Sequence, residues 1–144
     1  MTAFTEPFTL VLVEDDEGHA RLISRNLQRT GVRNPIVRLK NGEEALNWLF
    51  GAQGQPCVVI LDLNLPDIDG FEILHRLKTD VRTRDMPVIV LTTTDHPNDI
   101  ERCFALGCDG FLTKPVGHDA FAAHLDKLGL ALSVVPVSPL RDRS

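Results

Sequence analysis

The sequence lacks the features that mark membrane, secreted or nucleic-acid-binding proteins. No apolar stretch approaches the roughly 20 residues that a membrane-spanning helix needs. The N-terminus has no basic segment followed by an apolar one, so we expect no signal peptide and, by default, a cytoplasmic location. Acidic residues outnumber basic ones by 20 to 15, and the net charge of −5 argues against direct DNA binding, which requires a basic face.

Cysteine is also scarce. The chain has three cysteines, Cys57, Cys103 and Cys108, and no histidine lies beside or between the last two. Because a zinc site would need a second pair of ligands, this pattern favours neither a metal centre nor a redox pair. Cys57 begins an apolar run, and we expect it to be a small buried side chain.

The remaining composition is typical of one globular domain, with 144 residues that are 43% hydrophobic and 24% charged. Short apolar runs alternate with segments of helical periodicity. The runs predict strands over 8–13, 35–39, 57–61, 88–91 and 110–113, and the periodic segments predict helices over 17–30, 42–50, 70–79, 97–106 and 117–129. This alternation implies right-handed crossovers and a doubly wound α/β fold, a parallel sheet covered on both faces.

Helix-start signals support two of these boundaries. Asp15 or Asp16 stands where the N-cap of the first helix belongs. Asp95 stands where we expect the N-cap of the helix over 97–106, and Pro97 suits its first turn.

Four of the predicted strands end in polar residues of distinct chemistry. These are Glu14-Asp15-Asp16 after 8–13, Asp62 after 57–61, Thr92 after 88–91, and Lys114-Pro115 after 110–113. The carboxyl ends of parallel strands share one edge of the sheet, and open α/β sheets bind ligands in the crevice there. The sequence therefore predicts one cleft that gathers acids, a hydroxyl and an ammonium group.

This set suits a divalent cation and a phosphoryl group. Asp15 and Asp62 are the expected direct ligands of Mg²⁺, together with the backbone carbonyl of Asn64, and Glu14 is expected to hold waters around the ion. Asp62 could then attack a phosphoryl group to form an acyl phosphate, while Lys114 and Thr92 stabilise the transferring charge. Taken singly, each acid could equally be a loop carboxylate or a helix cap, so the prediction rests on their coincidence at four strand ends.

Over roughly residues 8–129 the chain resembles a two-component response-regulator receiver domain (CheY-like). The motifs that match this family in order and spacing are Val13-Glu14-Asp15-Asp16, Leu61-Asp62-Leu63-Asn64-Leu65-Pro66-Asp67-Ile68-Asp69-Gly70, Leu91-Thr92-Thr93 and Thr113-Lys114-Pro115. The resemblance implies a flavodoxin-like (βα)5 fold with strand order 2-1-3-4-5. It also implies that Asp62 accepts phosphate from a sensor histidine kinase, with Thr92 as the switch hydroxyl and Phe111 as the switch aromatic.

A narrower resemblance is to single-domain regulators that partner bacterial phytochromes. It rests on Asp62-Leu63-Asn64-Leu65-Pro66, Leu91-Thr92-Thr93-Thr94, Thr113-Lys114-Pro115-Val116 and the ending Leu130-Ala131-Leu132-Ser133-Val134-Val135-Pro136. It implies a bacteriophytochrome kinase as the partner. Residues 130–144 form an extension that is either a frayed tail or an arm that packs on the domain or joins a homodimer.

Several functions remain open at this point. The expected one is a phosphorylation-dependent switch that acts through an unknown protein target, because about 15 residues after the last predicted helix are too few for a DNA-binding fold. The chain would then not be an enzyme in the usual sense, since it modifies only itself. Alternatives are a phosphorelay intermediate and a pseudo-receiver that only binds a partner. An aspartyl-phosphate phosphatase or dehalogenase is disfavoured, because it wants an acid where Asn64 stands.

The first predicted helix carries a stripe of arginines at four-residue spacing, namely Arg21, Arg25 and Arg29. By resemblance this helix is the element that docks on a kinase. The alternative is an ordinary solvated face.

Overall fold

The computed structural model describes residues 8–29, 33–52, 56–93 and 96–114, which contain five strands and four helices. The elements in chain order are β1 (Thr9–Val13), α1 (Glu17–Arg29), β2 (Ile36–Leu39), α2 (Gly42–Gly51), β3 (Cys57–Asp62), α3 (Gly70–Thr79), β4 (Val88–Thr92), α4 (Pro97–Ala105) and β5 (Gly110–Thr113). The predicted helix over 117–129 and the extension over 130–144 lie outside the described residues. No helix of the described part of the chain is long and apolar enough to cross a membrane.

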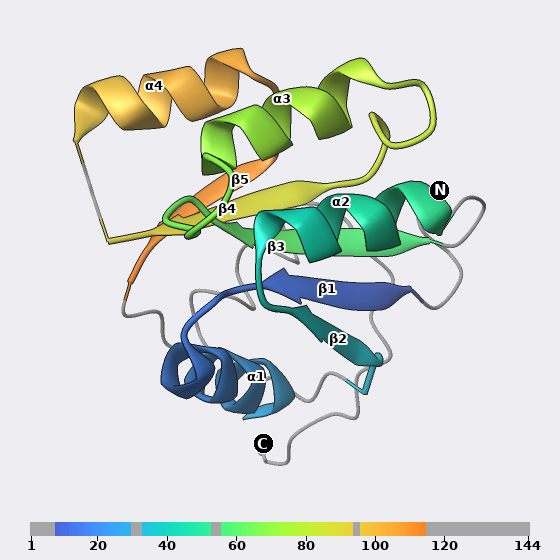
Figure 1. The fold of residues 1–144 in the computed structure, drawn as a ribbon. Helices are drawn as coiled ribbons and strands as arrows, with labels where there is room; N and C mark the ends of the chain where they lie inside the picture. Colours follow the sequence, from blue (N-terminus) through green and yellow to red (C-terminus); the bar gives the residue numbers. More distant parts are fainter. Residues whose placement is uncertain (1–7, 30–32, 53–55, 94–95, 115–144) are drawn as a thin grey trace, which may run out of the picture.

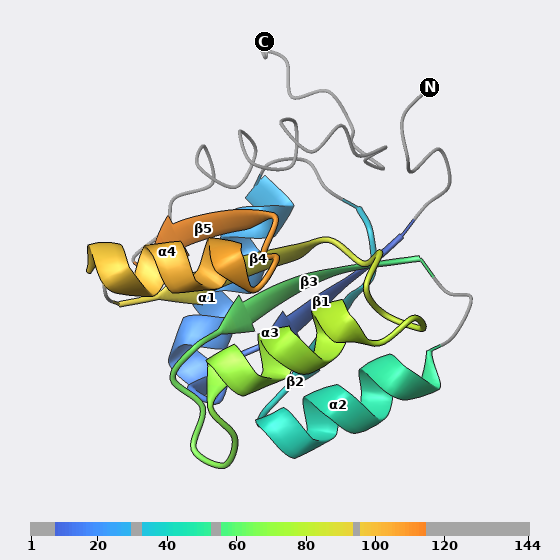
Figure 2. The same cartoon turned by 90° about the horizontal axis from the view of Figure 1, so that it is seen from above.

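All five strands are parallel and form one sheet in the order β2-β1-β3-β4-β5. Helix α1 covers one face, and α2, α3 and α4 lie on the other (Figures 1 and 2). The predicted doubly wound fold and its strand order are thus confirmed. The chain moves from β1 outward to β2 and then returns past β1 to β3, so the order reverses between β1 and β3. At such a reversal the crossovers diverge to opposite sides and leave a crevice beyond the strand ends.

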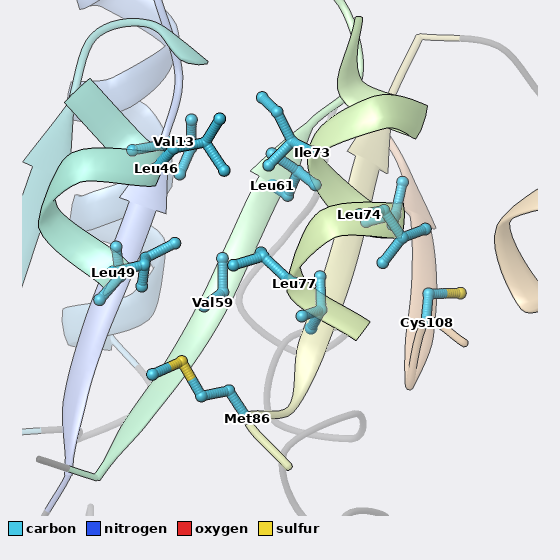
Figure 3. Close-up of a cluster of buried hydrophobic side chains, with 14 of the residues drawn as sticks. Val13, Leu46, Leu49, Val59, Leu61, Ile73, Leu74, Leu77, Met86 and Cys108 are labelled. Atoms are coloured by element: carbon cyan, nitrogen blue, oxygen red, sulfur yellow. The ribbon is translucent and has the colours of Figure 1, made fainter. Parts of the chain in front are cut away.

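Two hydrophobic clusters pack on the two faces of the sheet, because successive strand residues point in opposite directions. In β1 and β3, Val11, Val13, Val59 and Leu61 face α2 and α3. Figure 3 shows this cluster, in which Ile73, Leu74 and Leu77 of α3 lie over the strands. The intervening residues Leu10, Leu12, Val58 and Ile60 join Ala20, Ile23 and Leu27 of α1 in the second cluster. Burial on both faces explains why these strands appear in the sequence as continuous apolar runs.

The helix-cap predictions had mixed success. Asp16 is the cap of α1, and its Oδ1 accepts a hydrogen bond from His19 N at 2.8 Å. The prediction of Asp95 for α4 was wrong, because the N-cap is His96, whose Nδ1 accepts from Asn98 N at 3.3 Å. Pro97 occupies the first helical position as predicted, and this placement makes the residue directly before it the cap.

The three cysteines are free thiols buried in the core, as expected for small apolar side chains. Burial raises the pKa of Cys57 and of Cys103 to about 11, and that of Cys108 to about 12. Thiols with such pKa values are almost fully protonated at neutral pH and are poor nucleophiles.

Candidate functional site

Lys114 joins the ends of three strands at the carboxyl edge of the sheet. Its Nζ donates to Glu14 Oε1 at 2.5 Å and to Asp62 Oδ2 at 3.1 Å. Glu14 follows β1, Asp62 ends β3 and Lys114 follows β5. Each of the three lies two residues after a strand residue whose side chain points toward α1, namely Leu12, Ile60 and Leu112. Because side chains alternate between the two faces along a strand, all three side chains project to the α1 side of the sheet. The sequence analysis predicted that Lys114 and Asp62 share this cleft, whereas the bond of Lys114 to Glu14 was not predicted.

Because this ion cluster is buried, the pKa of Glu14 and the pKa of Lys114 depend strongly on the neighbouring charges. Glu14 and Asp62 expose only 1% and 2% of their surface. Burial raises the pKa of the Glu14 carboxyl, the hydrogen bond from Lys114 opposes the rise, and the negative charge of Asp62 adds to it. Burial by itself would lower the pKa of Lys114, but the bond to Glu14 and the charge of Asp62 outweigh it, and the pKa is raised. Lys114 is therefore an ammonium ion at neutral pH.

Glu14, Asp15 and Asp62 form a group that could hold a metal ion. Each offers one carboxylate oxygen, and these oxygens lie within 4.8 Å of one another. Among the described residues, Lys114 is the one Lys or Arg that forms an ion pair with any of them. Three carboxylates thus share one cation, and unpaired buried charge is costly. An all-oxygen donor set with an excess of negative charge fits a hard divalent cation such as Mg²⁺, and the exposed Asp15 leaves room for bound waters.

Asn64 lies at the start of the loop between β3 and α3. Its backbone N donates to Asp62 Oδ1 at 3.0 Å, and its side-chain Nδ2 lies 3.4 Å from Thr93 Oγ1. The first bond holds the segment that carries the Asn64 carbonyl against Asp62. The role of the Asn64 carbonyl as a metal ligand stays a prediction.

The same loop is closed at its far end by a glycine. Gly70 N donates to Leu63 O at 3.2 Å, and a Cβ at residue 70 would lie 2.5 Å from the Leu63 Cα. Only glycine permits this close approach of two backbone segments. Asp69 caps α3 directly before it, with Oδ1 accepting from Phe71 N at 2.9 Å.

Asp67 ties the loop to a different helix. Its carboxylate accepts from Gly42 N at 2.8 Å and from Glu43 N at 2.9 Å, the first residues of α2. These bonds lower the pKa of the Asp67 carboxyl. The loop after Asp62 is thus fixed to both α2 and α3, a tie that sequence reasoning missed because Asp67 precedes α3 and not α2.

The side chains of Thr92 and Phe111 point to the other face of the sheet, the face that α2, α3 and α4 cover. Thr92 ends β4 and is buried, with 1% of its surface exposed. Phe111 lies in β5 opposite Val90 and packs against the cluster under α2 and α3. Thr92 also lines a groove of about 480 Å³ together with Asp15 and Asn64, so it reaches the same opening as two predicted metal ligands.

Arg38 is a further residue at this edge that the sequence analysis did not single out. It lies on β2, and its guanidinium donates from Nε to Glu14 O at 3.0 Å and from Nη2 to Asp15 O at 3.1 Å. No local pattern distinguishes such an arginine from a solvated one on an edge strand.

Comparison with known proteins agrees with this geometry. A model of the response regulator receiver domain matches residues 10–126. The probable methanogenesis regulatory protein FilR2 of Methanothrix harundinacea is 38% identical over 118 residues, which cover 79% of this chain and 76% of that protein. Two other curated relatives are longer, and the matched region spans about half of their length, 50% and 48%.

Solved structures are similar as well. A response regulator receiver domain from Rhodospirillum rubrum is 46% identical with a TM-score of 0.74, covering 85% of this chain and 91% of that chain. The bacteriophytochrome response regulator AtBRR is 32% identical with a TM-score of 0.78, covering 90% of this chain and 98% of that chain. The fold, the acidic edge with its lysine and these matches lead to one conclusion: this chain belongs to the response regulator receiver domain family.

Proposed function

We propose that this chain is a phosphoacceptor switch that receives a phosphoryl group on Asp62 from a histidine kinase. The observation that carries the proposal is the bond from Lys114 to Asp62 inside a group of three carboxylates. A buried carboxylate held by an ammonium ion beside a cation site is equipped to attack phosphorus and to stabilise the product. The chain modifies itself and acts on no separate small substrate.

Each residue of the site has a distinct part in this reaction. A carboxylate oxygen of Asp62 attacks phosphorus, the bond from phosphorus to the kinase histidine breaks, and its electron pair leaves on the imidazole nitrogen. Lys114 and the Thr92 hydroxyl donate to phosphoryl oxygens. A Mg²⁺ ion bound by Asp15, Asp62 and the Asn64 carbonyl would offset the charge of the phosphoryl oxygens. Glu14 also accepts a hydrogen bond from Lys114 and so helps to hold the ammonium group in place.

The phosphorylated state then differs in its packing. We infer that Thr92 moves toward the phosphoryl group and that Phe111, which is half-buried on the neighbouring strand opposite Val90, turns inward. The similarity to a bacteriophytochrome response regulator supports a bacterial phytochrome as the kinase.

Intact mass after incubation with acetyl phosphate or beryllofluoride, with and without Mg²⁺, tests this proposal. Wild type should gain one adduct only with Mg²⁺, and Asp62→Asn should gain none. Asp85→Asn, the same change at an exposed acid outside the site, should behave as wild type. A folded wild type without an adduct would refute phosphotransfer and leave a protein that only binds its partner.

The kinase assignment needs its own measurement. Phosphoryl transfer should be faster from a bacteriophytochrome kinase than from an unrelated histidine kinase at equal concentrations. Equal rates would refute the narrower assignment without affecting the chemistry at Asp62.

A further inference from the structure

Arg38 holds the segment that connects β1 to α1. Its guanidinium donates to two consecutive backbone carbonyls, those of Glu14 and Asp15, at 3.0 and 3.1 Å. The side chain reaches them from β2, the edge strand, where Arg38 is in register with Leu12. Two donors in the plane of one guanidinium fix the orientation of the backbone segment as well as its distance from β2. A single ammonium group cannot fix the orientation in this way.

Asp15 depends on this backbone for its position. Its side chain is exposed, and none of the described residues donates a hydrogen bond to its carboxylate. The neighbouring acids are held by side-chain contacts, since Glu14 and Asp62 both accept from Lys114. The segment is also anchored on either side of Asp15. Glu14 N donates to Leu39 O at 3.0 Å, and Asp16 N donates to Glu14 Oε2 at 3.2 Å. Asp16 in turn accepts from His19 N at its Oδ1 at 2.8 Å and from Ala20 N at its carbonyl at 2.9 Å.

We propose that Arg38 is a positioning residue for Asp15 and thereby sets the affinity of the acidic group for a divalent cation. This inference rests on the proposed function, in which Asp15 is a ligand of Mg²⁺. The guanidinium touches the carbonyls behind the ligand and not the ligand itself. Partners of this kind orient metal-binding groups, and their removal typically weakens metal binding or activity about 10- to 100-fold.

A purely electrostatic role of Arg38 predicts the opposite change in the affinity for a cation. If Arg38 acted only through its positive charge, its removal would strengthen the binding of a cation, because like charges repel. If it positions Asp15, its removal weakens binding, and a lysine, which keeps the charge but has one donor group, restores binding only in part. The sign of the change therefore distinguishes the two roles.

The test compares Arg38→Gln, Arg38→Lys and a matched control, Arg25→Gln, in the full chain. Arg25 and Arg38 both line a groove between α1 and β2, but among the described residues Arg25 makes no hydrogen bond to the Glu14–Asp16 segment. Calorimetric titration with Mg²⁺ should give about tenfold weaker binding for Arg38→Gln, a smaller loss for Arg38→Lys, and no loss for Arg25→Gln. Circular dichroism shows whether each variant is folded. If Arg38→Gln does not fold, the comparison of Mg²⁺ binding is made between Arg38→Lys and wild type.

A second readout needs neither metal nor activity. In metal-free protein the backbone amides of Asp15 and Asp16 should exchange with deuterium faster in Arg38→Gln than in wild type or in Arg25→Gln. Equal or tighter Mg²⁺ binding by Arg38→Gln would overturn this inference alone. Absence of Mg²⁺ binding by folded wild type would overturn the proposed metal site and this inference with it.

Discussion

Replacing Lys114 by methionine should cost a large part of the stability of the protein. The change leaves two carboxylates, 1% and 2% exposed, without the ammonium that now bonds to them at 2.5 and 3.1 Å. At an effective dielectric of about 20, attraction across about 3 Å is worth roughly 5 kcal/mol for each pair. Protonation of Glu14 and the absence of a buried ammonium to desolvate offset part of this loss. We therefore expect a net destabilisation of about 3–5 kcal/mol at pH 7, the range found when one partner of a buried ion pair is removed.

The pH dependence identifies the cause. Glu14 has a raised pKa in the folded protein, so its ionisation costs stability above its ordinary pKa, and protonation removes that cost as the pH falls through the folded value. Loss of Lys114 raises this pKa further, so the deficit of Lys114→Met should shrink between pH 7 and pH 5. Lys114 has a raised pKa, so its stabilising effect is complete below its ordinary value of 10.5 and disappears as the pH rises through the folded value.

Urea unfolding followed by circular dichroism measures both effects, in EDTA and then in Mg²⁺. Mg²⁺ should stabilise Lys114→Met more than wild type, because the cation replaces the missing charge. Lys40→Met is the control, since that side chain is exposed, and we expect a change within about 0.5 kcal/mol. A Lys114→Met protein within about 1 kcal/mol of wild type at pH 7, or a deficit that persists unchanged at pH 5, would refute this reasoning.

Three further predictions concern the loop and the core. Gly70→Ala should destabilise the protein by about 1–3 kcal/mol in urea unfolding, because its Cβ would meet the Leu63 backbone, whereas Gly51→Ala, with nothing within 4 Å, should not destabilise it. Asp67→Asn should be less stable than wild type above pH 4 and should lose less stability on acidification. The reason is that the lowered pKa of Asp67 contributes stability that is complete above its ordinary value of 3.8 and is lost as the pH falls through the lower folded value. Equal acid unfolding curves would contradict it. Iodoacetamide at pH 8 should leave the native thiols unmodified and should alkylate all of them in guanidinium, as mass spectrometry would show for Cys57, Cys103 and Cys108.

The fold could be predicted because its determinants are local and periodic. Each strand of the sheet is a short apolar run, each described helix has a regular apolar face, and chirality leaves few ways to join them. Boundaries were accurate to about one residue, and both Asp62 and Thr92 proved to be the last residues of their strands. The prediction of Asp95 as the N-cap was wrong because Pro97 is the first residue of α4, and the N-cap is the residue directly before it, His96.

The position of the site was predictable, but its internal contacts were not. That parallel strands end at one edge was enough to bring Glu14, Asp62 and Lys114 together. The bond between Lys114 and Glu14 and the bonds from Arg38 to the β1–α1 segment connect residues 100 and about 24 positions apart. Such contacts depend on strand phase and on the rotamers of long side chains, neither of which a linear pattern records. The roles of the site residues and the binding of Mg²⁺ remain predictions.

The two-residue period of the strands has a consequence for how such a protein can diversify. Glu14, Asp62 and Lys114 follow the phase that faces α1, whereas Thr92 and Phe111 follow the phase that faces the helices on the other side. Thr92 therefore connects the two faces of the sheet, because it would donate to a phosphoryl group on Asp62 although its side chain follows the same phase as Phe111. Mutations around Phe111 can suit a new downstream protein without changing Asp62 or Lys114, whereas a change at Thr92 would alter the reaction and the switch together.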